Sequence, residues 1–416
     1  MIKAEVIFIP APGVGHLVST IEFSKLLISR DDRISISILI MNLSSDASIL
    51  GITQSLQKDV PDRLAFVDIP ALDETIMTGL QSKGYLNFLM SFLEIQKTKV
   101  RDIVASILSR SVSSKLAGLV IDFFCTPMID VANEFNVPTY VFFTPAAASL
   151  GFMFYSQSLK DNENQEIYEY KDSDAELSIP SFSNPVPAKV LPSMMLSKDG
   201  SDIFTNISRR LREAKAIVVN TVMELEAHSI KSLVEDENTP LLHHVGPIIK
   251  STNGESTSQG QLSNQAIISW LDSHPPSSVV FLCFGSMGTF DPEQVTEIAC
   301  ALELSGQRFL WCLRRPSQEK ETGALPKNYD NYNEVFPEGF LERTAEIGKV
   351  IGWAPQAEEI ERGIRCLMDG ESEMRKKVKE MKDTCRKATA EGGSSYNSAG
   401  QFIEDLMSNI RNKRGA

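Results

Sequence analysis

A histidine and an aspartate, each next to or within a short apolar run, could together remove a proton from a substrate. His16 closes residues 10–16, a turn rich in proline and glycine that follows the apolar run 6–9. Asp122 lies near the end of the apolar run 116–124, where burying an unpaired carboxylate would be costly. A histidine held by an aspartate can act as a general base. Two ordinary alternatives stay open, namely capping or packing for His16 and a cap or a backbone hydrogen bond for Asp122.

The turn before His16 differs from the common phosphate-binding loops. Residues 10–17 read Pro-Ala-Pro-Gly-Val-Gly-His-Leu, which lacks the third glycine of a dinucleotide fingerprint and the Gly-Lys-Ser/Thr of a P-loop. The next apolar run ends in Met41-Asn42, without the acidic residue that would bind a ribose. An NAD-dependent dehydrogenase is therefore disfavoured. His16, one of five histidines, remains the unusual residue of this turn and a candidate base at the mouth of a cleft.

Three residues of the second half also follow apolar runs and could contact a ligand. Ser286 stands within residues 284–288, where small residues allow backbone N–H groups to approach an anion. The indole of Trp353 could stack on a flat base, and Gln356 could hydrogen-bond the edge of that base. The ordinary alternatives are a simple strand-to-helix turn at Ser286 and a core or interface position for Trp353.

Short apolar runs alternate with helical patterns through the first half of the chain. The runs are rich in Val, Ile and Phe and are continuous rather than alternating, which is typical of strands buried on both faces of a parallel sheet. The pattern therefore predicts an α/β fold with a doubly wound parallel sheet. The predicted strands are residues 5–10, 34–41, 64–69, 116–124, 139–144 and 216–220, with helices at 17–27, 85–108 and 127–134.

The second half begins the same pattern again after a linker but does not complete it. Residues 250–263 are rich in Ser, Gly, Gln and Asn, which is typical of a flexible linker. Only three convincing strands follow, whereas a doubly wound domain usually has about five or six. Beyond Gln356 only helical patterns remain. We therefore predict a first domain at 1–249, an incomplete second domain at 264–390, and a C-terminal helix at 391–416 that packs back on the first domain. The three strands are 278–284, 308–313 and 349–352.

Composition narrows the class of protein. The 416 residues carry a net charge of −13, which argues against nucleic acid or an anionic membrane as a partner, because both require clustered Lys and Arg. The first apolar run is too short for a signal peptide, and no stretch reaches the length of a membrane span. The six cysteines are scattered without metal-ligand spacing. These features predict a cytoplasmic protein with reduced cysteines and no metal site.

Taken in order along the chain, these segments resemble the plant family-1 UDP-glycosyltransferases, and flavonoid and triterpenoid glucosyltransferases most of all. Each segment is a weak signal alone, but the ordered set is specific. The resemblance implies the GT-B fold, with two facing Rossmann-like domains. The segments are Pro-Gly-Val-Gly-His at 12–16, Asp-Phe-Phe at 122–124, Val-Asn-Thr at 219–221 with Glu-Leu-Glu at 224–226, Val-Gly-Pro at 245–247, Trp-Leu-Asp at 270–272, Phe-Gly-Ser-Met-Gly at 284–288, Arg-Phe-Leu-Trp at 308–311, Phe-Pro-Glu-Gly-Phe at 336–340, Gly-Trp-Ala-Pro-Gln at 352–356 and Glu-Gly-Gly-Ser-Ser at 391–395.

The resemblance implies that glucose is transferred from UDP-glucose to a hydroxyl group of a small apolar plant compound, with inversion at the anomeric carbon. His16, with Gly15 beside it at the acceptor, would deprotonate the hydroxyl, and Asp122 would stabilise the imidazolium. It further implies a monomer whose partners are the UDP-sugar and the aglycone, with no metal and no cofactor apart from the donor substrate. The donor-binding residues so implied are Thr144 for a sugar hydroxyl, Ser286 for the diphosphate, and Trp353, Ala354 and Gln356 for the uridine.

The chain departs from the family pattern after Gln356. The family continues with a His-Cys-Gly-Trp-Asn-Ser stretch, a ribose-binding Glu, and an acidic residue followed by Gln at the glucose, whereas this chain proceeds directly into a charged helical tail. Losing charge-assisted contacts worth about 1.5–3 kcal/mol each would greatly weaken donor binding. The expectation is therefore a weakly active or inactive transferase. The alternative is a non-catalytic protein that binds aglycones.

Overall fold

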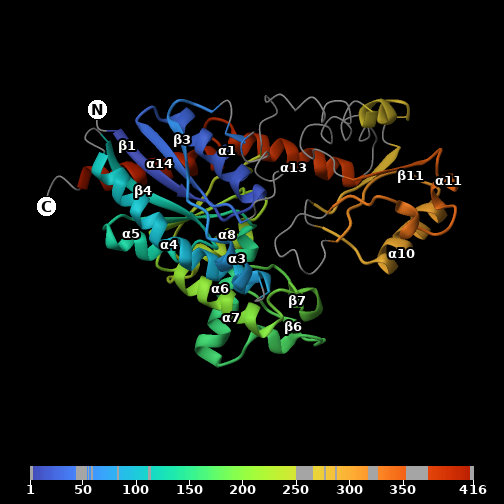
Figure 1. The fold of residues 1–416 in the computed structure, drawn as a ribbon, viewed down its shortest axis with the longest axis horizontal. Helices are drawn as coiled ribbons and strands as arrows, with labels where there is room; N and C mark the ends of the chain where they lie inside the picture. Colours follow the sequence, from blue (N-terminus) through green and yellow to red (C-terminus); the bar gives the residue numbers. More distant parts are fainter. Residues whose placement is uncertain are drawn as a thin grey trace. The chain divides into compact units, whose positions relative to one another are not determined.

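The computed structural model of the chain describes residues 3–43, 54, 56–57, 60–81, 84–110, 114–249, 266–275, 278–285, 288–316, 327–352 and 373–412. The chain divides into two compact units. Unit 1 comprises Met1–Lys250 together with Glu380–Ala416, and unit 2 comprises Ser251–Lys379. Each unit contains its own parallel β-sheet (Figure 1).

Unit 1 is built on a sheet of seven parallel strands in the order β3-β2-β1-β4-β5-β8-β9. Side chains of β1 alternate between two hydrophobic clusters, with Val6 and Phe8 on one face and Ile7 and Ile9 on the other. Both faces are buried, which explains why the strands are continuous apolar runs. The strands are β1 (Lys3–Ile9), β2 (Ile34–Ile40), β3 (Leu64–Asp68), β4 (Ser114–Asp122), β5 (Thr139–Phe143), β8 (Ala216–Val219) and β9 (Leu241–His244).

Helices cover both faces of this sheet. One cluster joins the sheet to α4 (Tyr85–Arg110), α5 (Met128–Glu134), α6 (Ala147–Glu163), α7 (Lys198–Leu211) and α8 (Ala227–Glu235). The other cluster joins it to α1 (Val14–Arg30) and α14 (Ser394–Asn412). The remaining elements of unit 1 are α3 (Glu74–Gln81), the short 3-10 helices η1 (Ile167–Tyr170) and η2 (Ala188–Val190), and the hairpin strands β6 (Glu176–Leu177) and β7 (Val186–Pro187).

Helix α14 brings the end of the chain back to the first sheet, beside β1 and β4 (Figure 1). The fully buried ring of Phe402 packs 5.8 Å from Phe23 and 5.2 Å from Tyr140, measured between ring centroids. Asn409 Nδ2 donates to the carbonyl of Ala117 at 2.8 Å and to the Tyr140 hydroxyl at 2.7 Å. Because Phe402 and Asn409 both reach central strands, α14 is part of the core of unit 1.

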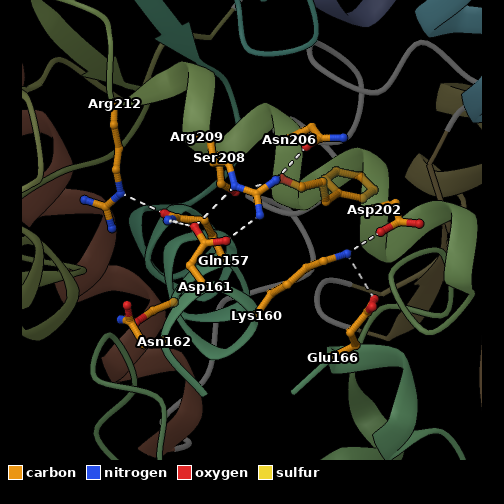
Figure 2. A network of polar contacts seen from close by, with 12 residues as sticks. Gln157, Lys160, Asp161, Asn162, Glu166, Asp202, Asn206, Ser208, Arg209 and Arg212 are labelled. Atoms are coloured by element: carbon orange, nitrogen blue, oxygen red, sulfur yellow. Dashed lines mark hydrogen bonds and ion pairs between the residues drawn. The ribbon is translucent and has the colours of Figure 1, made fainter. Parts of the chain in front are cut away.

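A network of polar contacts fixes α6 against α7 (Figure 2). Lys160 pairs with Asp202 on α7 and, at 3.3 Å, with Glu166. Arg209 pairs with Asp161, and Arg212 Nε donates to Gln157 Oε1 at 2.9 Å. Half-exposed ion pairs contribute little singly, but several together restrict the relative movement of the two helices. Helix α6 matters for the site because it begins just after β5.

Unit 2 has three parallel strands in the order β10-β11-β12, within the residues described. They are β10 (Val279–Leu282), β11 (Arg308–Cys312) and β12 (Gly348–Ile351). Helix α10 (Pro292–Ser305) begins with a capping box between Asp291 and Gln294. Trp311 and Phe309 of β11 pack with Phe340 of α11 (Phe340–Arg343), and η3 (Tyr332–Glu334) lies nearby in sequence. Helix α13 (Glu373–Thr389) then leads back to unit 1.

Two features bear on membranes and metals. Of the helices described, none is both long enough and apolar enough to cross a bilayer. The described residues also contain no group of three or more His, Cys, Asp or Glu side chains placed to hold a metal ion.

Candidate active site

His16 lies in the first turn of α1, directly after the glycine-containing turn that leaves β1. Gly13 is the residue before the helix and has φ 156°, a value that strains residues with a Cβ. The Leu17 N–H donates to the Gly13 carbonyl at 3.1 Å, which starts the helix. A Cβ at Gly13 would lie 3.6 Å from Cδ2 of His16. The glycine thus sets the turn that places the imidazole at the carboxyl edge of the sheet.

Asp122 ends β4, the neighbour of β1 in the sheet, and meets His16 there. Its Oδ2 lies 2.7 Å from His16 Nδ1, and its Oδ1 accepts the Phe124 N–H at 3.0 Å. The Asp122 side chain is 2% exposed and that of His16 is 30% exposed. The carboxylate is therefore held on both oxygens below the surface, while the imidazole reaches solvent.

Burial and charge act in opposite directions on the imidazole. Burial lowers the pKa of His16, whereas the charge of Asp122 and its hydrogen bond raise it, and the net result is a pKa above 6.5. The contact with the carboxylate assigns the proton of the neutral ring to Nδ1. Nε2 is then the nitrogen with a free lone pair, and Asp122 stabilises the imidazolium formed when Nε2 takes a proton.

Aromatic rings surround this pair. The ring centroids of Phe123 and Phe124 lie 6.2 and 6.0 Å from that of His16, and the two phenyl rings lie 4.2 Å from each other. Phe124 is half-buried and also contacts Phe204 of α7 at 6.2 Å. Behind them, burial raises the pKa of the Cys125 thiol, which keeps it neutral. Phe123 is buried in the core, so the partly exposed ring of Phe124 is the apolar surface that these two rings offer beside the base.

Of the other predicted site residues, Gly15 and Thr144 fall within the described residues. Gly15 is exposed beside His16. Thr144 follows β5 directly and is partly exposed. Asp122 pairs with Phe142 of β5, so Thr144 leaves the sheet at the same edge as the dyad. The residues predicted to bind diphosphate and uridine, namely Ser286, Trp353, Ala354 and Gln356, lie outside the described residues.

Sequence reasoning assigned no role to Glu226, which fixes the segment after Thr144. Helix α6 begins at Ala147 and has no cap from its own flanking side chain. The two carboxylate oxygens of Glu226 instead accept the N–H groups of Ala147 at 2.8 Å and of Ala148 at 3.0 Å. The Thr221 hydroxyl donates to the same carboxylate. The sequence offered Glu226 only as part of the Glu-Leu-Glu segment at 224–226 and gave no hint of its role, because Ala147 and Ala148 are distant in sequence.

Known proteins of similar sequence are plant glycosyltransferases. A UDP-glucose flavonoid 3-O-glucosyltransferase 6 from Fragaria ananassa is 42% identical over 485 aligned positions, which cover 97% of this chain and 99% of the relative. UDP-glycosyltransferase 71E1 from Stevia rebaudiana is also 42% identical, with 98% and 99% covered. A comparison with models of protein families gave no match.

Solved structures show the same relationship. A UGT transferase from Siraitia grosvenorii in complex with UDP has a TM-score of 0.82 at 36% identity, with 97% of this chain and 100% of that chain covered. UGT71G1 from Medicago truncatula, complexed with UDP-glucose, has a TM-score of 0.78 at 34% identity, with 97% and 98% covered. This chain belongs to the plant UDP-glycosyltransferases. The predicted α/β architecture of GT-B type is confirmed by these neighbours and by the parallel sheets of both units.

The chain is shorter than its alignment with these relatives. The alignment with the Fragaria protein runs over 485 positions, whereas this chain has 416 residues. At least 69 positions of the alignment, the difference between the two numbers, are therefore gaps in this chain. The alignment length therefore agrees with a chain that lacks part of the family sequence. That the missing part follows Gln356 stays a prediction from the motif that stops there.

Proposed function

We propose that this chain is an inverting O-glucosyltransferase in which His16 is the base, UDP-glucose the donor and a small apolar plant hydroxyl compound the acceptor. The observation that carries the proposal is the 2.7 Å contact between His16 Nδ1 and the buried Asp122 carboxylate at the carboxyl edge of the sheet. Membership of a family of UDP-glycosyltransferases, with relatives named for flavonoid substrates, supports the choice of donor and acceptor.

The chemical step follows from the geometry of the dyad. In this proposal the acceptor hydroxyl lies against Nε2 of His16, with its apolar body beside the partly exposed ring of Phe124. Its oxygen attacks the anomeric carbon as the proton passes to Nε2, and the bond from that carbon to the diphosphate breaks. The attack comes from the face opposite the leaving group, so the configuration inverts. Asp122 stabilises the new imidazolium, and UDP leaves with the electron pair of the broken bond.

The donor contacts in this proposal are those implied by the family. Thr144 would bind a sugar hydroxyl, and Glu226 would hold the segment that carries it by fixing the start of α6. Ser286 would contact the diphosphate, and Trp353, Ala354 and Gln356 the uridine. Because at least 69 aligned positions are absent and charge-assisted contacts contribute about 1.5–3 kcal/mol each, we expect transfer to be slow or undetectable.

The test is glucoside formation by the purified 416-residue chain with UDP-glucose and a flavonol, followed by mass spectrometry. Expected is a trace of product that disappears in His16→Ala and persists in His228→Ala, a matched change at an exposed histidine bonded to the Pro180 carbonyl. Product that is unchanged in His16→Ala would refute the assignment of the base. Rapid transfer by the unaltered chain would refute the expectation of weak activity.

A second candidate function is a non-catalytic aglycone-binding protein, and the missing aligned positions favour it. Unit 1 retains the dyad and its aromatic surroundings, whereas unit 2 has three strands among its described residues. Calorimetry distinguishes the two functions. Binding of the flavonol without binding of UDP-glucose supports the binding protein, and binding of both supports the transferase.

A further inference from the structure

Arg314 lies at the carboxyl end of the central strand of unit 2, where its backbone is fixed on both sides. β11 runs between β10 and β12 and ends at Cys312. Beyond it, the Leu313 N–H donates to the Ile351 carbonyl at 2.9 Å, and the Arg315 N–H donates to the Lys327 carbonyl at 2.8 Å. Ligands of open α/β sheets bind at this edge, outside the carboxyl ends of the strands. The position of Arg314 is thus that of a ligand-binding residue.

The guanidinium of Arg314 is partly buried, and one of its nitrogens has no hydrogen-bond partner. Its Nε is buried and makes no hydrogen bond, and in the described part of the chain it is the only lysine or arginine nitrogen in that condition. Arg212 is a useful contrast, because it is also half-buried but bonds to Gln157 and Asp236 and stacks on Phe154. Burial lowers the pKa of Arg314, yet an arginine stays cationic in proteins. A buried cationic donor without a partner is costly.

The neighbouring strand end carries a glycine whose backbone could approach such an anion. At the neighbouring strand end, just beyond β10, Gly285 adopts φ +81°, and no described atom lies within 4 Å of a Cβ placed there. A glycine at such a position allows a ligand to approach the backbone closely. The rigid fork of a guanidinium matches the oxygens of a phosphate group. An acidic chain of net charge −13 attracts no anion in general, so binding here would depend on local cations such as Arg314.

We propose that Arg314 binds the diphosphate of a nucleoside diphosphate donor at the carboxyl edge of the sheet of unit 2. This inference rests on the proposed function, because it takes the nucleotide sugar as the ligand of that edge. Because Arg314 is present in this chain, it could still bind the donor even though at least 69 aligned positions are absent. Free phosphate compounds share this chemistry, so the experiment compares UDP with inorganic pyrophosphate and with uridine.

The experiment is titration calorimetry of the full chain with UDP, pyrophosphate and uridine. Arg314→Met removes the charge and keeps most of the aliphatic stem, while Arg315→Met makes the same change at the adjacent exposed arginine. We expect Arg314→Met to weaken UDP and pyrophosphate at least tenfold and Arg315→Met to weaken them less than twofold. Arg314→Lys should fall between, because it keeps the charge and loses the fork. Uridine should bind equally to all variants if it binds at all.

Thermal unfolding without ligand separates binding from a purely structural role. Removing an unpaired buried cation should leave the unfolding temperature of Arg314→Met equal to or above that of the parent chain, whereas losing a structural contact would lower it. Undetectable binding of UDP by the parent chain, equal weakening by both methionine variants, or a lower unfolding temperature for Arg314→Met would each overturn the proposal. None of these results would affect the test of the dyad, which measures the base through the His16 variants.

Discussion

Replacing Asp122 by asparagine tests the base of this site without requiring turnover. The change keeps the shape of the side chain and removes the negative charge that lies 2.7 Å from His16 Nδ1. In the parent chain, burial lowers the pKa of His16 and Asp122 raises it, with a net value above 6.5. The variant keeps only the effect of burial. We therefore expect the pKa of His16 to fall below 6.5 in Asp122→Asn.

The size of that fall can be bounded from the exposure of the two side chains. An opposite charge in direct contact shifts a pKa by about 1–3, and each pKa unit corresponds to about 1.36 kcal/mol. Asp122 is 2% exposed, which favours a large effect, but the 30% exposure of His16 lets solvent screen the charge. The pKa of His16 should therefore fall in the variant, by less than the same change would cause at a fully buried pair.

The assay is an NMR titration of the histidine ring protons in the parent chain and the variant. The resonance of His16 is identified by its absence in His16→Gln. In the variant, the asparagine amide can donate to Nδ1, which moves the ring proton to Nε2 and removes the base. A His16 pKa that is unchanged or raised in Asp122→Asn would refute the role assigned to the aspartate.

The same pair predicts how the stability of unit 1 varies with pH. The folded pKa of His16 is raised above its unfolded value of 6.5, so the stabilising effect of the pair is fully present below about pH 6.5. It is lost as pH rises through the folded pKa. The difference in free energy of unfolding between the parent chain and Asp122→Asn should therefore shrink above that pH, which denaturant titrations at several pH values would measure.

Two further predictions concern the framework of unit 1. Glu226→Ala leaves the N–H groups of Ala147 and Ala148 without their carboxylate and should lower the free energy of unfolding by about 0.5–2 kcal/mol, measured by urea titration. Hydrogen exchange should become faster only at the start of α6. Faster exchange spread evenly over unit 1 would contradict a local cap. Phe402→Ala should lower the free energy of unfolding by about 3–5 kcal/mol in the same titration, because its ring is fully buried. Phe182→Ala is the control and should lower it far less, because that ring is 37% exposed. Equal losses of stability would mean that α14 does not contribute to the core.

Sequence alone was enough for elements whose signals are local. The continuous apolar runs identified β1 and β4 because both faces of these strands are buried. The glycine-rich turn and the carboxylate inside an apolar run singled out His16 and Asp122, and the structure places the two side chains in contact. Their catalytic roles stay predictions. Parallel strands end at a common edge, so residues that follow two such runs can be expected to lie close together even without a resemblance to a family.

The missed features depend on contacts between distant segments. β9 reads Leu-Leu-His-His and has no apolar run of its own, but it pairs with β8, and His243 packs 5.5 Å from Phe402 of α14. Glu226 acts on a helix start that no nearby residue caps. Arg314 follows a buried strand like many arginines, and only the missing partner of its Nε distinguishes it. Tertiary packing decides each of these cases, and the sequence carries no local signal for them.

The acceptor and donor halves of the proposed reaction can be tested separately, because the residues of each lie in different units. His16, Asp122 and Glu226 all belong to unit 1, whereas Arg314 belongs to unit 2. A loss confined to unit 2 leaves the pKa of His16 unchanged and removes only the binding of anions. A chain with a raised His16 pKa that binds aglycone but not UDP would therefore be a binding protein with an unused base. If the same chain binds UDP through Arg314, slow transfer would instead reflect the donor contacts predicted to be missing after Gln356.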